Sequence, residues 1–67
     1  MTVFVNNEPR LTDTSVTLIT FLKEQNLQSF HGIAVAVNNS VIPKTNWQTY
    51  QLNDNDKIIL IKATQGG

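Results

Sequence analysis

Residues 57–63 read KIILIKA, and this stretch decides the fold of the chain. Its four consecutive large aliphatic residues, at 58–61, are typical of a strand that has neighbours on both sides. The run IAVAV at 33–37 and the opening TVFV at 2–5 are the other clear strand segments. We therefore place residues 57–63 at the centre of a sheet, beside residues 2–5.

Two asparagine pairs, Asn6-Asn7 and Asn38-Asn39, predict tight hairpin turns. Asparagine is favoured there because it tolerates the left-handed backbone that such turns require. The strands expected to follow these turns are a weak strand at 10–12 and a short strand at 41–43. Pro9 favours an edge position for the first of them, since proline cannot donate to a ladder.

Between the hairpins the apolar period changes. Phe21 and Leu22 follow Leu18 by three and four residues, so all three lie on one face of a helix. This spacing indicates an amphipathic helix. The predicted helix runs from Ser15 to Leu27, with Thr14 or Ser15 as N-cap and Asn26 as its end.

The predicted order of two strands, one helix and three strands favours an α+β fold of the β-grasp (ubiquitin-like) type. In that fold a five-stranded mixed sheet carries one main helix packed on one face, and the helix provides the crossover between parallel neighbours. A chain of 67 residues forms one small domain. We expect it to span residues 1–63, with residues 64–67 as a flexible C-terminal tail.

Alternation along the strands divides the apolar side chains between two faces. The set expected to face the helix is Val3, Val5, Val35, Val37, Ile58 and Leu60. The other face has no covering layer, and an uncovered apolar patch usually marks a partner surface. The predicted partner-binding patch is Phe4, Ala34, Ala36, Ile59 and Ile61, with Lys44 as an added candidate contact. The simplest interpretations of Lys44 and Trp47 are a plain surface charge and an aromatic cap on the core.

Composition argues against several function classes. The formal net charge is zero, so no basic surface favours nucleic acid. The longest apolar run, at 33–37, is far shorter than the ~20 residues that cross a bilayer. The absence of cysteine excludes disulfides and thiolate chemistry. No export leader opens the sequence, so we expect a cytoplasmic protein, with an organelle stroma as the alternative.

Side-chain chemistry is equally sparse. His31 is the only histidine, and its simplest interpretation is an ordinary exposed loop residue. A calcium loop counted from Asp54 would place Ile59 at the required glycine and Gln65 at the required glutamate. A solvated turn is therefore the better interpretation of Asp54 and Asp56. We predict a protein that is not an enzyme and that binds no metal or cofactor of its own.

The remaining candidate is the terminal Gln65-Gly66-Gly67. Glycines cannot catalyse through side chains, but they let the backbone approach the wall of a pocket closely. A carboxylate on such an arm becomes reactive once ATP converts it to an acyl-adenylate, which a sulfur or nitrogen nucleophile displaces. Ile59 and Ile61 lie just upstream, where they would seat the domain while the arm enters a partner.

Four segments of the chain carry a family resemblance: VNNEPRL at 5–11, TLITFL at 17–22, AVNNSVIPKTNW at 36–47 and LNDNDKIILIKATQGG at 52–67. They resemble the ThiS family, the ubiquitin-like sulfur carriers of thiamine biosynthesis. The resemblance implies that a ubiquitin-activating-like adenylyltransferase (ThiF type) adenylates Gly67 with Mg²⁺ and ATP. Sulfur from a donor such as a cysteine desulfurase then yields a thiocarboxylate at Gly67, which a thiazole synthase (ThiG type) consumes.

Three positions depart from the family pattern. Lys44 stands where arginine is common, Asn55 replaces a glycine between two aspartates, and Gln65 replaces a small residue. Alternatives within the same class are a molybdopterin-synthase-type sulfur carrier subunit and a protein-conjugating modifier. From a different class, the chain could be a β-grasp interaction module that binds through its uncovered face and never uses its terminus.

Overall fold

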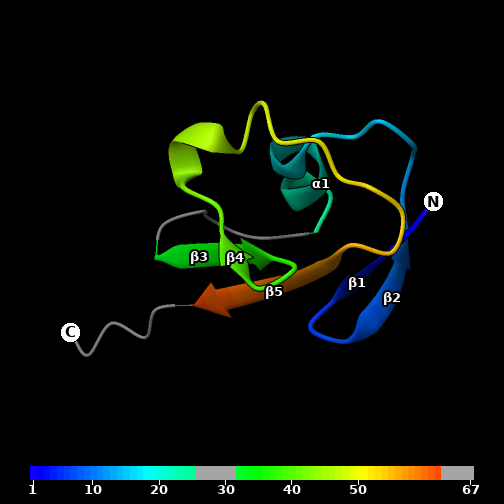
Figure 1. The fold of residues 1–67 in the computed structure, drawn as a ribbon, viewed down its shortest axis with the longest axis horizontal. Helices are drawn as coiled ribbons and strands as arrows, with labels where there is room; N and C mark the ends of the chain where they lie inside the picture. The colour runs from blue at the N-terminus through cyan, green and yellow to red at the C-terminus, as the bar shows by residue number, and fades with distance from the viewer. Residues whose placement is uncertain (26–31, 63–67) are drawn as a thin grey trace.

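The computed structural model describes residues 1–25 and 32–62, and in them it contains five strands, one α-helix and one short 3-10 helix (Figure 1). Their bounds are β1 (Thr2–Val5), β2 (Glu8–Leu11), α1 (Leu18–Lys23), β3 (Ile33–Val37), β4 (Ser40–Val41), η1 (Lys44–Asn46) and β5 (Lys57–Lys62). The strand order is β2-β1-β5-β3-β4, with β5 parallel to β1 and antiparallel to β3. The central position of β5 and the mixed sheet beneath α1 confirm the predicted β-grasp fold.

Both asparagine turns are confirmed. Asn6 and Asn7 have φ angles of 49° and 71°, and Asn38 and Asn39 have φ angles of 52° and 71°. Two successive residues in the left-handed region give the backbone twist of a type I′ hairpin. Each turn therefore joins its two strands without extra loop residues.

The edge strands differ from the prediction in their bounds. β2 begins before Pro9, which the sheet tolerates because the Phe4 N–H is directed to the Asp56 carbonyl at 2.8 Å and not to β2. The missing donor of Pro9 consequently faces outward. β4 has two residues where three were predicted at 41–43. The Ile42 N–H still donates to the Val35 carbonyl at 2.9 Å, in continuation of the β3–β4 register, and Pro43, which has no N–H, is already the N-cap of η1.

The helix begins later than predicted. α1 starts at Leu18, and Thr17 is its N-cap, whose hydroxyl oxygen accepts a hydrogen bond from the Thr20 N–H at 3.4 Å. The prediction of Thr14 or Ser15 as N-cap is therefore wrong. Ser15 instead has a φ angle of 62°, which belongs to a left-handed turn that precedes the helix.

Tertiary contacts determine this late start. The Tyr50 carbonyl accepts from the Leu18 N–H at 2.8 Å, and the Trp47 carbonyl accepts from the Ile19 N–H at 3.0 Å. These two donors of the first helical turn have no partner within the helix, so the segment after η1 satisfies them. The helix also ends earlier than predicted, at Lys23, with Glu24 as its C-cap. The predicted end, Asn26 and Leu27, lies outside the described residues.

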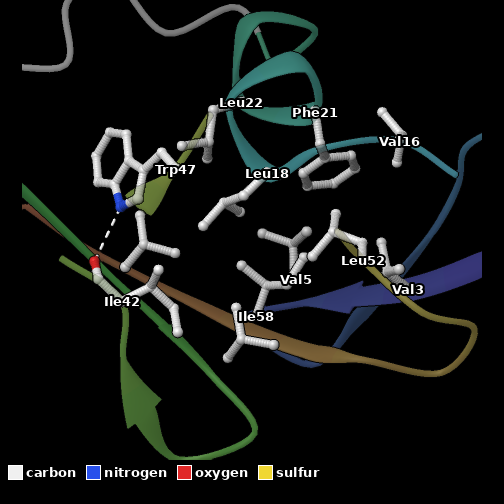
Figure 2. Packing of buried hydrophobic residues seen from close by; sticks show 12 residues of the cluster. Val3, Val5, Val16, Leu18, Phe21, Leu22, Ile42, Trp47, Leu52 and Ile58 are labelled. Carbon is white, nitrogen blue, oxygen red and sulfur yellow. Dashed lines mark hydrogen bonds between the residues drawn. The ribbon is translucent and has the colours of Figure 1, made fainter. Parts of the chain in front are cut away.

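The core fills the space between α1 and the sheet (Figure 2). Its buried members are Val3, Val5, Val16, Leu18, Phe21, Leu22, Val35, Val37, Ile42, Trp47, Leu52 and Ile58. Of the residues predicted to face the helix, all are buried except Leu60, which is partly buried. Trp47 is 2% exposed, and its Nε1–H donates to the Ile42 carbonyl at 2.9 Å, which confirms its place as a core aromatic.

The turn before β5 contains a buried, hydrogen-bonded carboxylate, whereas a solvated turn was predicted. Asp56 is only 6% exposed, and its carboxylate accepts from the Asn38 Nδ2–H at 2.9 Å and from the Asn53 N–H at 2.7 Å. Asp54 is exposed, and its Oδ1 accepts from the Thr2 N–H at 2.9 Å. The prediction is thus wrong for Asp56, because this carboxylate joins the β3–β4 hairpin to the start of β5.

Candidate functional site

Strand β5 leads directly to the candidate carrier tail. It is paired with β3 as far as Lys62, its last residue. The three predicted tail residues, Gln65, Gly66 and Gly67, lie outside the described residues. The structure therefore describes the central strand from which the tail departs, but not the tail itself (Figure 1).

Two asparagine side chains fasten β5 to the hairpins on either side of it. Asn38 Oδ1 accepts from the Lys57 N–H at 3.0 Å, and Asn6 Oδ1 accepts from the Leu60 N–H at 3.1 Å. Both asparagines are first residues of the hairpin turns, so one residue type forms the turn and also extends the ladder. Sequence reasoning found the turns but missed these bonds, since their partners are distant in the chain. These two bonds tie β5 to both hairpins at Lys57 and Leu60.

The predicted patch lies on the face of the sheet opposite α1. The register pairs Ala36 with Ile59 and Ala34 with Ile61, which brings these four residues together. Ile61 is 50% exposed and Ile59 and Ala34 are also exposed, whereas Ala36 is buried by its neighbours. Phe4 is partly buried and pairs with Lys57, one row away from the others. The structure thus unites most of the predicted patch around the end of β5.

Two exposed apolar residues on this face were missed. Val41 is 68% exposed, and the pairing of Ala36 with both Val41 and Ile59 places all three in one row. Leu11 is 87% exposed but lies opposite Thr2 in edge strand β2, away from that row. Alternation along the short fourth strand, with Ile42 inward, could have identified Val41. Together with the neighbouring pair of Ala34 and Ile61, the three residues in that row form one apolar surface. We call this set the apolar row: Ala34, Ala36, Val41, Ile59 and Ile61.

Lys44 is not part of the apolar row. It begins η1, which lies on the same side of the sheet as α1 (Figure 1). Its Nζ lies 5.7 Å from the centroid of the Trp47 ring, within the range of a cation–π contact. Any partner that touches both Lys44 and the apolar row must therefore reach around the β4 edge of the sheet.

Other chemistry is absent from the described part of the chain. Residues 1–25 and 32–62 contain no group of three or more histidine, cysteine or acidic residues that could hold a metal ion. None of the helices described is long and apolar enough to span a membrane. His31 lies outside the described residues.

The sequence model of the ThiS family matches residues 3–67. The chain belongs to the ThiS family. It is accordingly a ThiS-type sulfur carrier, a small ubiquitin-like protein. The match includes both the apolar row and Gly67, so the family assignment covers the whole candidate site.

Solved structures agree with this assignment at the level of the fold. A crystal structure of the thiamine biosynthesis protein ThiS from Geobacter metallireducens superposes with a TM-score of 0.87, at 20% sequence identity and 100% coverage of both chains. A solution NMR structure of a thiamine biosynthesis protein from the same organism gives a TM-score of 0.79, at 20% identity, covering 100% of this chain and 88% of that one. A comparison with curated proteins finds no significant match.

Proposed function

We propose that this ThiS-family chain carries sulfur as a thiocarboxylate on Gly67 and delivers it to a thiazole synthase in thiamine biosynthesis. The observation that carries the proposal is the family match, which extends through the glycine pair. The pairing of β5 with β3 as far as Lys62 supports it, because the strand that precedes the glycine pair is held in the centre of the sheet. An adenylating enzyme of the ThiF type is the first partner.

The chemistry has two steps on the Gly67 carbonyl and a closing reduction. In the first, the carboxylate attacks the α-phosphate of Mg-bound ATP, which forms the acyl-adenylate and releases pyrophosphate. In the second, the terminal sulfur of a persulfide on a cysteine desulfurase attacks the acyl carbon; the C–S bond forms as the bond to the AMP oxygen breaks and AMP leaves. A thiol reductant then cleaves the S–S bond of this acyl persulfide, which releases the thiocarboxylate and leaves the desulfurase sulfur in a disulfide with the thiol. The carrier supplies no catalytic side chain, so ATP and Mg²⁺ belong to the activating enzyme.

The apolar row provides the seat for the activating enzyme. Burial of apolar surface is worth about 25 cal/mol per Å², and this gain offsets the entropy lost when the tail is ordered. Ile59 and Ile61 lie on β5, the strand that precedes the tail. A partner that contacts them therefore binds close to the start of the tail, which helps to bring Gly67 to the adenylating pocket. Lys44, on the other side of the sheet, is a second and separate contact.

Intact mass spectrometry tests the proposal. The protein is incubated with a purified ThiF-type enzyme, Mg-ATP, cysteine, a cysteine desulfurase and a thiol reductant, and we expect a gain equal to the mass difference between sulfur and oxygen. The control is the variant lacking Gly67, which we expect to remain unchanged. An unchanged mass of the intact chain would overturn the carrier mechanism and favour the interaction module.

A second assay separates the two carrier pathways. The thiocarboxylate form is presented in parallel to a thiazole synthase and to the large subunit of molybdopterin synthase. We expect loss of sulfur only with the thiazole synthase. Transfer only to the molybdopterin enzyme would replace the thiazole pathway by its alternative.

A further inference from the structure

Strand β5 is central for only part of its length. Its odd-numbered residues direct their backbone groups to β3, as the bond from the Asn38 N–H to the Lys57 carbonyl at 2.8 Å shows. Its even-numbered residues face β1, where the Asn6 N–H donates to the Ile58 carbonyl at 2.9 Å. The β1 register ends at the pair Val5 with Ile58, because the chain turns away at the first hairpin.

One side chain extends the ladder beyond that point. Asn6 Oδ1 accepts from the Leu60 N–H, as a carbonyl of a longer β1 would do. By the same alternation the Leu60 carbonyl and the Lys62 N–H point to the β1 side. Among the described residues, none forms a hydrogen bond with either group on that side. Figure 1 shows that β5 runs past the β1–β2 hairpin, which leaves this length of its edge open.

We propose that an extended segment of the enzyme that adenylates Gly67 adds to this open edge as a further strand, accepting from the Lys62 N–H and donating to the Leu60 carbonyl. The inference rests on the proposed function and specifies how the partner takes hold beside the tail. Unpaired strand groups are a template for an extended backbone, which gives affinity through main-chain bonds. The partner segment is therefore defined chemically as a strand.

Charge and side-chain pattern narrow the occupant further. In antiparallel pairing of two copies through this edge, the two Lys62 ammonium groups would lie close together, which disfavours self-association. The same lysine favours an acidic residue on the incoming strand. Ile59 and Ile61 flank the edge on the open face of the sheet, so alternate residues of that strand are expected to be apolar.

The other two edges offer less to an added strand. β2 lacks an outward donor at Pro9, and β4 has only two residues, Ser40 and Val41. The open edge of β5 also lies five residues before Gly67, which limits the reach of the terminus to roughly 17 Å. A strand bound there would hold the arm at a short, defined distance from the adenylating pocket.

Amide hydrogen exchange by NMR tests the inference, on the full chain alone and in complex with the purified ThiF-type enzyme. We expect exchange at the Lys62 amide to slow by about tenfold or more on binding, as for an amide that gains a strand partner. The internal control is the Ile59 amide, which already faces β3 and should change little. An unprotected Lys62 amide in a complex that still produces the thiocarboxylate would overturn the inference and leave the carrier function intact.

A pair of variants separates the backbone from the charge. Lys62→Pro removes the outward N–H while leaving the β3 ladder whole, and Lys62→Ala removes only the ammonium group. We expect the proline variant to weaken enzyme binding about tenfold and the alanine variant to stay within about threefold of the parent chain. Equal loss in both would refute strand addition. Failure of the parent chain to form the thiocarboxylate would instead overturn the proposed function, and the inference with it.

Discussion

Replacing Asp56 by asparagine exchanges one carboxylate oxygen for an NH₂ group at a site with two donors. In the parent chain the carboxylate accepts from the Asn38 side chain at 2.9 Å and from the Asn53 N–H at 2.7 Å. The new amide can accept from only one of them, so either orientation sets a donor against a donor. Asn38 cannot rotate to compensate, because its Oδ1 already accepts from the Lys57 N–H at 3.0 Å.

The expected loss of unfolding free energy is about 1.5–3 kcal/mol, the range for a hydrogen bond to a charged group in a buried site. For a domain of this size the melting temperature falls by roughly 4–8 °C per kcal/mol. Urea unfolding monitored by fluorescence measures the change, since Trp47 is the only tryptophan and is buried. The midpoint should shift without a change in the denaturant slope.

Asp54→Asn is the matched control. It makes the same change in charge two residues away, but Asp54 is exposed and uses one oxygen, toward the Thr2 N–H, which an amide oxygen can replace. We expect it to lose less than about 0.5 kcal/mol. Equal stability of the two variants would refute the argument that Asp56 is a buried double acceptor. In an Asn38→Gly background the Asp56→Asn loss should shrink by about 1 kcal/mol, because the clashing donor is gone.

Three further predictions concern the tail, the apolar row and the helix. Deletion of Gly67 should abolish the mass gain while the melting temperature changes by no more than about a degree, since glycine has no side chain to pack; a larger thermal shift in calorimetry would show a structural tail. Val41→Asp should weaken binding of the ThiF-type enzyme about tenfold in calorimetric titration. The control Leu11→Asp changes an exposed apolar residue outside the apolar row and should bind with nearly the parent affinity. A larger loss of affinity in Leu11→Asp than in Val41→Asp would show that the apolar row is not the binding surface. Thr17→Ala should reduce stability by about 0.5–2 kcal/mol in urea, and an unchanged midpoint would show that the tertiary bonds alone start the helix.

Local chemistry explains the parts of the fold that could be predicted. The aliphatic run in β5 needs partners on both sides, and Asn6-Asn7 and Asn38-Asn39 tolerate left-handed backbone wherever they occur. Strand alternation assigns most of the core for the same reason, because side chains point up and down in turn whatever lies nearby. These features depend on residues that are adjacent in the chain.

The features that could not be predicted depend on contacts across the fold. Thr17 rather than Ser15 caps α1 because the Leu18 N–H finds the Tyr50 carbonyl, which is far along the chain. Its neighbours in the sequence predict that Asp56 is an exposed turn residue. It is buried because the side chain of Asn38, distant in the sequence, donates a hydrogen bond to its carboxylate.

The same division applies to the candidate site. The sequence by itself determined a small β-grasp domain and predicted the glycine pair as its candidate site, since composition, periodicity and the glycine pair are properties of the chain. Only the tertiary structure decided that Val41 joins Ala36 and Ile59 in one row, that Lys44 stands apart, and that β5 has an open edge beside its last residues. Strand register and the point where β1 turns away create those surfaces, and both are set by how the strands meet in space.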